Sequence, residues 1–420
     1  MLDVKEKMFK IGDKEAILRS GEYALQANGS IILQCGETLV QAIVTMGNEN
    51  PDLDFFPLTV EYNENLYAGG IIKSSKFSKR DGRPSDEAIL KARLIDRSIR
   101  PMFPKDFFRE VQVIINILSS DKKNPHDVLG LTASVAALAV SDIPFDAHLA
   151  GARISKVGDK LVVNPTYEEC DKQDFELVLA GNEKKIVMIE CAANCVADSE
   201  IEKAFEYSYG PLGEITKAIE EFQAECGKTK VDYVPRQLND EVYNRIKSFT
   251  LEKTEEFYVG LANKTIKRRE FDKVVTNKVL ATFTEEELKE KYSKKDILEA
   301  ADKIFKTFLR ESILKNKRRV DGRGIEEVRE ILIKINPIPR VHGSSMFMRG
   351  ETQVLNILTL GAPGNGQLSE SIEGESLKRY IHHYNAPPYS VGEVGRYGST
   401  GRREIGHGAL AEKEIGRAHV

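Results

Sequence analysis

The sequence has no long apolar stretch, and this absence argues against a membrane-spanning helix. Its longest nearly apolar run, from Val128 to Val140, holds 13 residues, whereas a helix needs about 20 to cross a bilayer. The opening stretch MLDVKEKMFK has early acidic residues and no apolar segment, unlike a secretion signal. We therefore expect no membrane partner.

Cysteine is scarce as well. The five cysteines are an odd number at irregular spacings, which is typical of reduced thiols in the cytoplasm and not of a disulfide framework. Cys191 and Cys195 have the spacing of one helical face, but no second Cys or His pair is close to them in the sequence. A structural zinc site is therefore not expected, and the predicted compartment is cytoplasmic.

Neither sign of charge dominates the chain. The formal net charge of −4 excludes a uniformly basic coat for nucleic acid but permits a locally basic groove. The sequence also lacks a Walker A loop, an HExxH motif and a nucleophile elbow. Those absences remove the common NTPase, zincin and α/β-hydrolase functions.

What the sequence does contain is an internal repeat. Residues 27–46 read ANGSIILQCGETLVQAIVTM and residues 341–360 read VHGSSMFMRGETQVLNILTL, so G-x6-G-E-T recurs at an offset of 314 residues. The residues after each Gly-Glu-Thr alternate or run apolar, as strands do. Farther on, EYNE at 61–64 is answered by HYNA at 383–386, which moves the offset to 322 and implies an eight-residue insertion.

The repeat sets the expected domain organisation. The first module spans residues 1–225, where strand and helix signals mix without strict βαβ alternation, so the expected fold class is α+β. Residues 239–317 are poor in glycine, rich in Lys and Glu and periodic as helices are, and they predict an all-helical domain. In that domain Thr284, followed by three glutamates, marks a helix start. The second copy, residues 318–413, is expected to be incomplete.

The most basic part of the first module is Ile71–Pro101, with nine Lys and Arg against four acids. An aromatic side chain inside a basic loop suits base stacking beside phosphate neutralisation, and arginines spaced by four and three share a helix face. The alternative is an ordinary charged surface with internal ion pairs. The candidates for RNA contact are Phe77, Lys79, Arg80 and Arg83 in the loop and Arg93, Arg97 and Arg100 on the helix.

The stretch GSTGRREIGHGALAE is the counterpart of this segment in the second copy. Arg402 and Arg403 can fork onto phosphate oxygens, and His407 can donate to a phosphate or position a sugar hydroxyl. A histidine alone is more often structural, but here it stands beside an arginine pair. The surrounding glycines are expected to let backbone N–H groups approach an anion; they are Gly398, Gly401, Gly406 and Gly408.

At these motifs the sequence resembles the bacterial polynucleotide phosphorylases. The matching stretches are DFFPLTVEYNENLYAGG, FSKRDGRPSDEAILKARLIDRSIRPMFP, RVDGRG, RGETQ, HHYNAPPYSVGEVG and GRREIGHGALAE. The resemblance implies two ribonuclease PH-like cores joined by an all-helical domain. It also implies that three subunits form a homotrimeric ring that threads single-stranded RNA.

The implied activity is reversible 3′→5′ phosphorolysis of RNA in mRNA degradation, in which inorganic phosphate releases nucleoside diphosphates. Such chemistry depends on charge neutralisation and positioning more than on a protein nucleophile. By resemblance, Arg402, Arg403 and His407 belong to the RNA-binding edge of the catalytic site. The implied cofactor is Mg²⁺ or Mn²⁺, and an RNA-degradation complex is a further implied partner.

The sequence departs from this family in three places. The family often has two bulky residues before the basic pair of this loop, and the second of these positions is Ser78 here. The serine-rich phosphate loop and the metal-binding carboxylates are expected beyond Val420, in a missing C-terminal part, so no metal ligand is named and this chain alone is expected to be inactive. Residues 414–420, EIGRAHV, resemble a translated sequencing adapter and are expected to be foreign, the alternative being a genuine variant tail.

Two other functions fit parts of the pattern. A non-catalytic RNA-binding or ring-scaffold subunit would hold RNA in the same modules without cutting it. A single-core ribonuclease PH that trims tRNA fits less well, because it has neither the repeat nor the helical connector.

Overall fold

A computed structural model gives the fold of this chain. It describes residues 2–49, 55–72, 79, 82–104, 106–145, 148–233, 239–262 and 277–417. The chain divides into two compact units. The first unit comprises Met1–Pro235 and Ala362–Val420, and the second unit comprises Arg236–Gly361. Strands and helices occur in both, so the fold is α+β.

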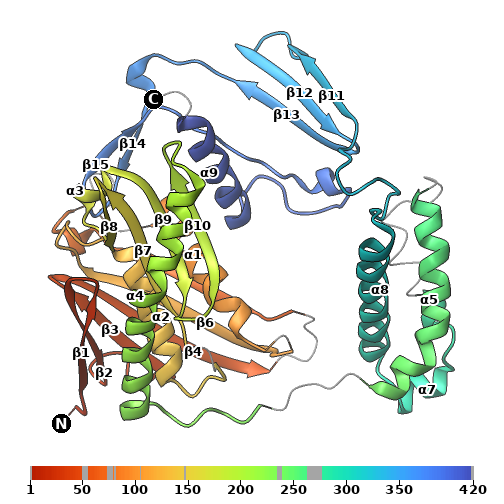
Figure 1. Ribbon diagram of the computed structural model, residues 1–420, viewed down its shortest axis with the longest axis horizontal. Coiled ribbons are helices and arrows are strands. Elements are labelled where there is room, and N and C mark those ends of the chain that lie inside the picture. The colour runs from red at the N-terminus through yellow and green to blue at the C-terminus, as the bar shows by residue number, and fades with distance from the viewer. Residues whose placement is uncertain are drawn as a thin grey trace. The chain divides into compact units, whose positions relative to one another are not determined.

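The first unit is built around a six-stranded sheet in the order β1-β2-β3-β4-β6-β5 (Figure 1). Neighbouring strands are antiparallel, except that β5 and β6 are parallel. Every second residue of β6 from Val111 to Ile117 is fully buried, the alternation of a strand with one face on the core. The strands are β1 (Lys5–Ile11), β2 (Lys14–Ser20), β3 (Gly29–Cys35), β4 (Thr38–Glu49), β5 (Leu58–Glu64) and β6 (Arg109–Ser119).

A second sheet of the first unit has the antiparallel order β10-β9-β7-β8. Helix α2 (His126–Val140) contacts both sheets, through β3 and β4 of the larger one and β7 of the smaller one. All residues of α2 except Asp127 are buried, as in a helix that is apolar all round. The strands of this sheet are β7 (Ala150–Val157), β8 (Lys160–Val163), β9 (Gln173–Gly181) and β10 (Ile186–Ala193).

Three further helices complete the fold of this part. Helix α1 (Asp86–Ile99) starts where the Ser85 side chain accepts a hydrogen bond from the Ala88 N–H. The single turn α3 (Tyr167–Cys170) begins with a capping box, and α4 (Asp198–Cys226) packs on β1, β7 and β9. The short 3-10 turns are η1 (Leu66–Gly69) and η2 (Arg100–Met102).

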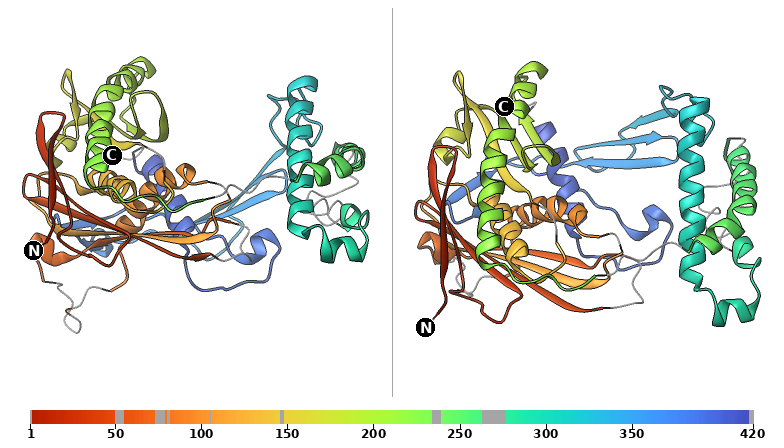
Figure 2. Two further views of the ribbon diagram at one scale, coloured as in Figure 1. Left: turned by 90° about the horizontal axis from the view of Figure 1, so that it is seen from below. Right: turned by 60° about the horizontal axis from the view of Figure 1, so that its bottom comes forward.

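The second unit has a helical part with its own small core. Helices α5 (Asp240–Ala262) and α8 (Lys294–Asn316) lie side by side, with α7 (Glu285–Glu290) between them in the sequence (Figure 2). The predicted helix start at Thr284 is confirmed, because its side chain accepts from the Glu287 N–H and the Glu287 carboxylate accepts from the Thr284 N–H. Among the described residues, no helix combines the length and apolar character needed to cross a bilayer.

The internal repeat is confirmed by strand register. The second unit contains an antiparallel meander, β11 (Ile331–Ile335), β12 (Gly343–Arg349) and β13 (Thr352–Leu358). In β3 and β4 the outermost pairs are Gly29 with Val44 and Cys35 with Thr38. In β12 and β13 they are Gly343 with Leu358 and Arg349 with Thr352, each shifted by 314. Leu18 pairs with Leu33, and Ile333 pairs with Phe347, so β11 matches β2.

Residues 362–417 belong to the first unit. Ile372, in the turn between β14 and β15, is fully buried in the core of that unit. The 3-10 turn η4 repeats η1 at an offset of 322: Gly392 has φ 70° and Gly70 has φ 69°, a left-handed conformation that glycine adopts without strain. The elements are η3 (Pro363–Asn365), β14 (Gln367–Glu370), β15 (Glu375–Lys378), η4 (Pro388–Val391) and α9 (Arg402–Arg417).

Candidate nucleic-acid interface

The basic loop of the first copy lies partly outside the described residues, and Phe77 and Arg80 fall there. Lys79 and Arg83 are described. The Arg83 guanidinium donates from Nη2 to the carbonyl oxygen of Thr400 at 3.3 Å. Thr400 comes two residues before α9, so the end of the first basic segment contacts the start of the second.

The predicted cluster of the second copy forms the beginning of α9. Arg402 donates from Nη1 to the Val60 carbonyl oxygen at 2.7 Å, and its Nη2 pairs with the Glu61 carboxylate on β5. Arg403 and His407 are exposed and are four residues apart, so they share one face of the helix. The His407 ring lies against Tyr384, with 4.4 Å between ring centroids.

The glycines of this cluster have a different role from the expected one. The Gly401 N–H donates to Oε2 of Glu404 at 2.6 Å, so it is not turned toward an anion. Gly406 and Gly408 are buried. A Cβ on Gly406 would lie 2.4 Å from Nε of Arg93, and one on Gly408 would lie 3.2 Å from the His382 carbonyl oxygen. The expectation that Gly406 and Gly408 admit an anion is therefore wrong: they admit neighbouring protein atoms.

The arginines of α1 lie against protein. The Arg93 side chain packs against Gly406 of α9, and Arg97 forms an ion pair with Glu190 at 3.0 Å. Glu190 also pairs with Lys413 of α9 at 3.3 Å. Both arginines nevertheless remain exposed to solvent. The pairing of Arg97 with Glu190 agrees with the alternative of internal ion pairs.

Arg100 joins the end of α1 to the start of β5. Its guanidinium donates to both oxygens of Asp96, at 2.6 and 2.7 Å, and to the carbonyl oxygens of Phe56 and Leu58, each at 3.0 Å. The hydrogen bond to Asp96 is the main cause that raises the pKa of Arg100. Four intramolecular acceptors give this arginine a structural role.

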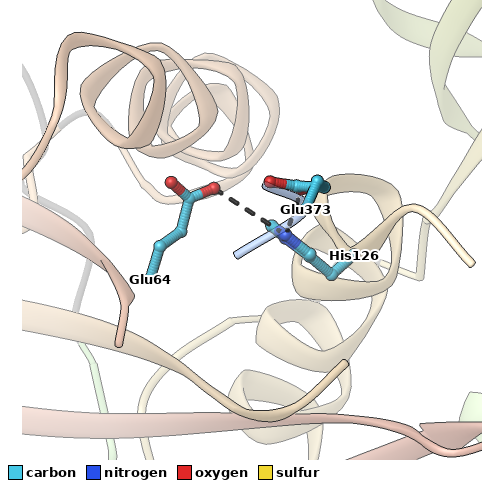
Figure 3. Close-up of side chains that lie close together, drawn as sticks. All are labelled: Glu64, His126 and Glu373. Atoms are coloured by element: carbon cyan, nitrogen blue, oxygen red, sulfur yellow. Dashed lines mark hydrogen bonds and ion pairs between the residues drawn. The ribbon is translucent and has the colours of Figure 1, made fainter. Parts of the chain in front are cut away.

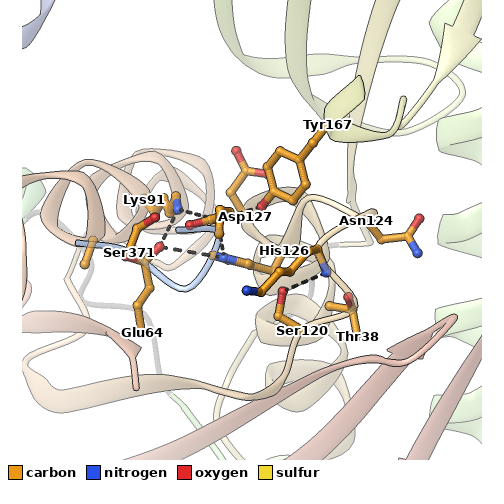
Figure 4. Close-up of polar contacts among 12 residues, drawn as sticks. Thr38, Glu64, Lys91, Ser120, Asn124, His126, Asp127, Tyr167 and Ser371 are labelled. Carbon is orange, nitrogen blue, oxygen red and sulfur yellow. Dashed lines mark hydrogen bonds and ion pairs between the residues drawn. The ribbon is translucent and has the colours of Figure 1, made fainter. Parts of the chain in front are cut away.

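A buried polar network, which the sequence analysis did not select, lies at the N-terminal end of α2 (Figures 3 and 4). Nε2 of the fully buried His126 is 3.0 Å from Oε1 of Glu373 and 3.8 Å from Oε1 of Glu64. The Tyr167 hydroxyl donates to the same oxygen of Glu373 at 2.7 Å. Lys91 Nζ pairs with Glu64 and is 4.0 Å from Glu373.

Two carboxylates of this network, Glu373 and Asp127, have lowered pKa values because positive groups lie beside them. Burial by itself would raise the pKa of Glu373, but the hydrogen bond from His126 and the charge of Lys91 outweigh it and hold the pKa well below the ordinary value. Burial would likewise raise the pKa of Asp127, yet Arg153, 2.6 Å away, and Lys91 lower it to about 2. Burial raises the pKa of the Tyr62 hydroxyl well above its usual range.

No local sequence signal marks this network, because its members come from separate elements. Glu64 ends β5, Lys91 is on α1, His126 starts α2 and Glu373 is in the β14–β15 turn. His126 and Glu373 are 247 residues apart. Glu64, His126 and Glu373 form one group among the described residues whose ligand atoms could hold a metal ion.

Most of the chain matches models of known protein families. Residues 14–144 and 327–419, together more than half of the chain, match the model of the 3′ exoribonuclease family, domain 1. Residues 149–210 match domain 2 of that family. Residues 241–324 match the model described as polyribonucleotide nucleotidyltransferase, RNA binding domain. The first of these matches includes part of the segment 414–420 that the sequence analysis set apart as a foreign tail.

Curated relatives of the chain include polyribonucleotide nucleotidyltransferases from several bacteria. The polyribonucleotide nucleotidyltransferase of Heliobacterium modesticaldum is 40% identical over 412 residues, which cover 97% of this chain and 57% of the relative. That of Treponema denticola is 40% identical over 420 residues, covering 98% and 58%. The chain thus spans little more than half the length of these relatives. Among solved structures, Rrp46 of rice (Oryza sativa) matches with a TM-score of 0.41 at 11% identity, covering 50% of this chain and 94% of that one.

Proposed function

The chain belongs to the 3′ exoribonuclease family, and from this we propose that it binds single-stranded RNA and serves in 3′→5′ phosphorolysis. In that reaction an oxygen of inorganic phosphate attacks the terminal phosphodiester, and the bond to the 3′ oxygen of the preceding nucleotide breaks. The products are a nucleoside diphosphate and an RNA shorter by one residue. The name that the curated relatives share supports this activity.

The observation that carries the proposal is the meeting of two basic segments from the two copies. Arg83 of the first copy contacts Thr400, and Arg402 is held on β5 by Val60 and Glu61. Arg403 and His407 are then exposed on one face of α9. Guanidinium groups bind phosphate oxygens through two parallel hydrogen bonds, so Arg83 and Arg403 are the proposed phosphate contacts.

Arg402 has a different part in this proposal. Its pairing with Glu61 neutralises much of its charge, but the bond to the Val60 carbonyl oxygen fixes the first turn of α9. We assign it the positioning of Arg403. Arg93, Arg97 and Arg100 are left out, because their guanidinium groups lie against Gly406, Glu190 and Asp96.

The metal of the reaction is a separate matter. Mg²⁺ or Mn²⁺ would neutralise charge on the phosphates when bound, and the family suggests one of these ions. The carboxylates that the resemblance implies for it do not occur in this sequence, so no residue here is assigned to hold it during phosphorolysis. A trimeric ring and a place in mRNA degradation are further parts of the proposal, and sedimentation of the protein tests the first of them.

A salt series on RNA affinity tests the phosphate contacts. Each phosphate neutralised on a single strand contributes about 0.7 to the slope of log K against log salt. We expect Arg403→Gln and Arg83→Gln each to flatten the slope by about that amount. Arg97→Gln is the matched control, since the same chemical change falls on an arginine that pairs with Glu190. Equal slopes for all three variants and the parent chain would contradict the proposal.

The second candidate function, a non-catalytic RNA-binding or scaffold subunit, makes a different prediction for the intact protein. Incubation with RNA, phosphate and Mg²⁺ releases nucleoside diphosphates if the protein is phosphorolytic and none if it only holds RNA. For the 420-residue chain by itself we expect RNA binding without release. Steady release from this chain would show that the residues present suffice for the chemistry.

A further inference from the structure

We propose that Glu64, His126 and Glu373 form a binding site for a divalent transition-metal ion such as Mn²⁺ or Zn²⁺. Their three ligand atoms all lie within 4.8 Å of one another (Figure 3). An ion with bonds of about 2.0–2.2 Å places neighbouring ligand atoms about 3 to 4 Å apart. The separations of 3.0 Å and 3.8 Å from His126 Nε2 to the two carboxylate oxygens fall in that interval. The site is independent of the RNA-binding proposal.

The donor set suits this class of ion. One imidazole nitrogen with two carboxylate oxygens is a borderline-hard set, which manganese and zinc accept and which calcium and magnesium, preferring oxygen alone, do not. His126 is fully buried and Glu64 is nearly so, whereas a quarter of the Glu373 side chain is exposed and gives an ion a route in.

A buried tyrosine orients the histidine for this role. The Tyr62 hydroxyl donates to the His126 carbonyl oxygen at 3.0 Å and lies 2.6 Å from Nδ1 of the same residue. With its proton on the carbonyl, the hydroxyl oxygen accepts the Nδ1–H and leaves Nε2 to face the carboxylates. Metal-bound histidines are held by such a partner on their other nitrogen.

The two carboxylates of the proposed site have one lysine between them. Asp127 is matched by Arg153 at 2.6 Å, but Glu64 and Glu373 share one lysine, Lys91. Two carboxylates thus face one ammonium group, and Figure 4 shows Glu64, Lys91 and His126 close together. A metal ion bound at Nε2 would add positive charge beside both carboxylates.

Lys91 is the internal competitor of the metal. Its ammonium group contacts both carboxylates, so it supplies positive charge where an ion would bind. Removal of this charge leaves the triad with two uncompensated carboxylates. The site therefore predicts that a variant lacking Lys91 binds metal more tightly than the parent, which a cluster that merely stabilises the fold does not predict.

Titration of the chelator-treated 420-residue chain with Mn²⁺, followed by electron paramagnetic resonance of the free ion, tests the site. We expect Glu373→Gln and His126→Gln to weaken binding at least tenfold, and Tyr62→Phe to weaken it about tenfold through loss of orientation. Lys91→Met is expected to strengthen it. Glu190→Gln is the matched control, a carboxylate of the same unit that pairs with Arg97 and Lys413.

The outcomes separate the site from a salt-bridge cluster. Binding that is lost in Glu373→Gln, kept in Glu190→Gln and strengthened in Lys91→Met supports it. Equal Mn²⁺ affinity in the parent, Glu373→Gln and Lys91→Met overturns it. Circular dichroism of each variant checks the fold, and if Glu373→Gln does not fold, the opposite shifts expected for Lys91→Met and Tyr62→Phe decide the question.

Discussion

The two meanders of this protein, β2-β3-β4 and β11-β12-β13, have the same strand register and opposite burial. Leu18, Leu33 and Val44 of the first meander are all fully buried. Their counterparts Ile333, Phe347 and Leu358 are 60%, 37% and 51% exposed. The strand register of the meander is thus repeated, whereas among the described residues only the first meander has a fully buried apolar face.

Among the described residues, one helix covers the first meander. In the first unit α2 packs across β3 and β4, and a Cβ on Gly29 would lie only 2.4 Å from the Ala137 carbonyl oxygen of that helix. At Gly343, the counterpart, the nearest atom to such a Cβ is in Leu358 at 3.4 Å, within the sheet itself. A meander therefore forms from turn chemistry and alternation, but its stabilisation depends on the layer that covers it.

The largest effect is expected from removing a buried side chain on the covered face of the first meander. Leu33→Ala should lower the free energy of unfolding of the first unit by about 3 kcal/mol, because it removes a fully buried side chain from a packed core. Phe347→Ala at the matching position should cost less than about 1 kcal/mol, since that ring is already partly in water. Denaturant unfolding, with hydrogen exchange of residues 29–44 and 343–358, measures both. Similar losses would show that the second meander is equally covered in solution.

A smaller effect is expected at the point where helix and strand touch. Gly29→Ala forces α2 away from β3 and should cost about 2 kcal/mol by overpacking. Gly343→Ala meets only ordinary contacts and should change stability by less than about 0.5 kcal/mol. Thermal melts of the two variants give the ratio, and a neutral Gly29→Ala would argue against this close approach of α2.

The smallest effects are expected at a turn that the two copies share. Gly36 and Gly350 occupy the same turn of each meander, with φ of 61° and 62°. Alanine in this left-handed conformation costs about 1 kcal/mol through the backbone alone. At Gly36 its Cβ would also lie 2.7 Å from Oδ2 of Asp121, whereas at Gly350 it would lie 3.0 Å from Cδ of Arg329. Both substitutions should loosen their hairpins, Gly36→Ala the more, as measured by exchange of the amides in each turn. A larger loss for Gly350→Ala would contradict this.

Much of the first unit followed from its sequence. The mixture of strands and helices expected for residues 1–225 is present. Helix α2 contains the longest nearly apolar run of the chain and is buried on almost all sides. Strand β1 carries alternating charged residues that resemble a surface segment. It sits at the edge of the sheet, where such residues are common.

The site was less predictable than the fold. Arg402, Arg403 and His407 do begin one helix, and Arg83 does come to its start, but the partners of Arg97 and Arg100 could not be read from their spacing. Equal spacing on a helix face says which residues share that face and nothing about what covers it. The same limit hid the network of Glu64, His126 and Glu373, whose members are far apart in the chain.

The sequence by itself determined the repeat, the meander register and the identity of the basic segments, because these depend on residues a few positions apart. Tertiary structure alone decided which helix covers the first meander, which partners the arginines have and where a histidine meets two carboxylates. The physical reason is that burial and charge pairing are set by side chains brought together from distant elements. His126 and Glu373 share a hydrogen bond only because the β14–β15 turn inserts Ile372 into the core of the first unit.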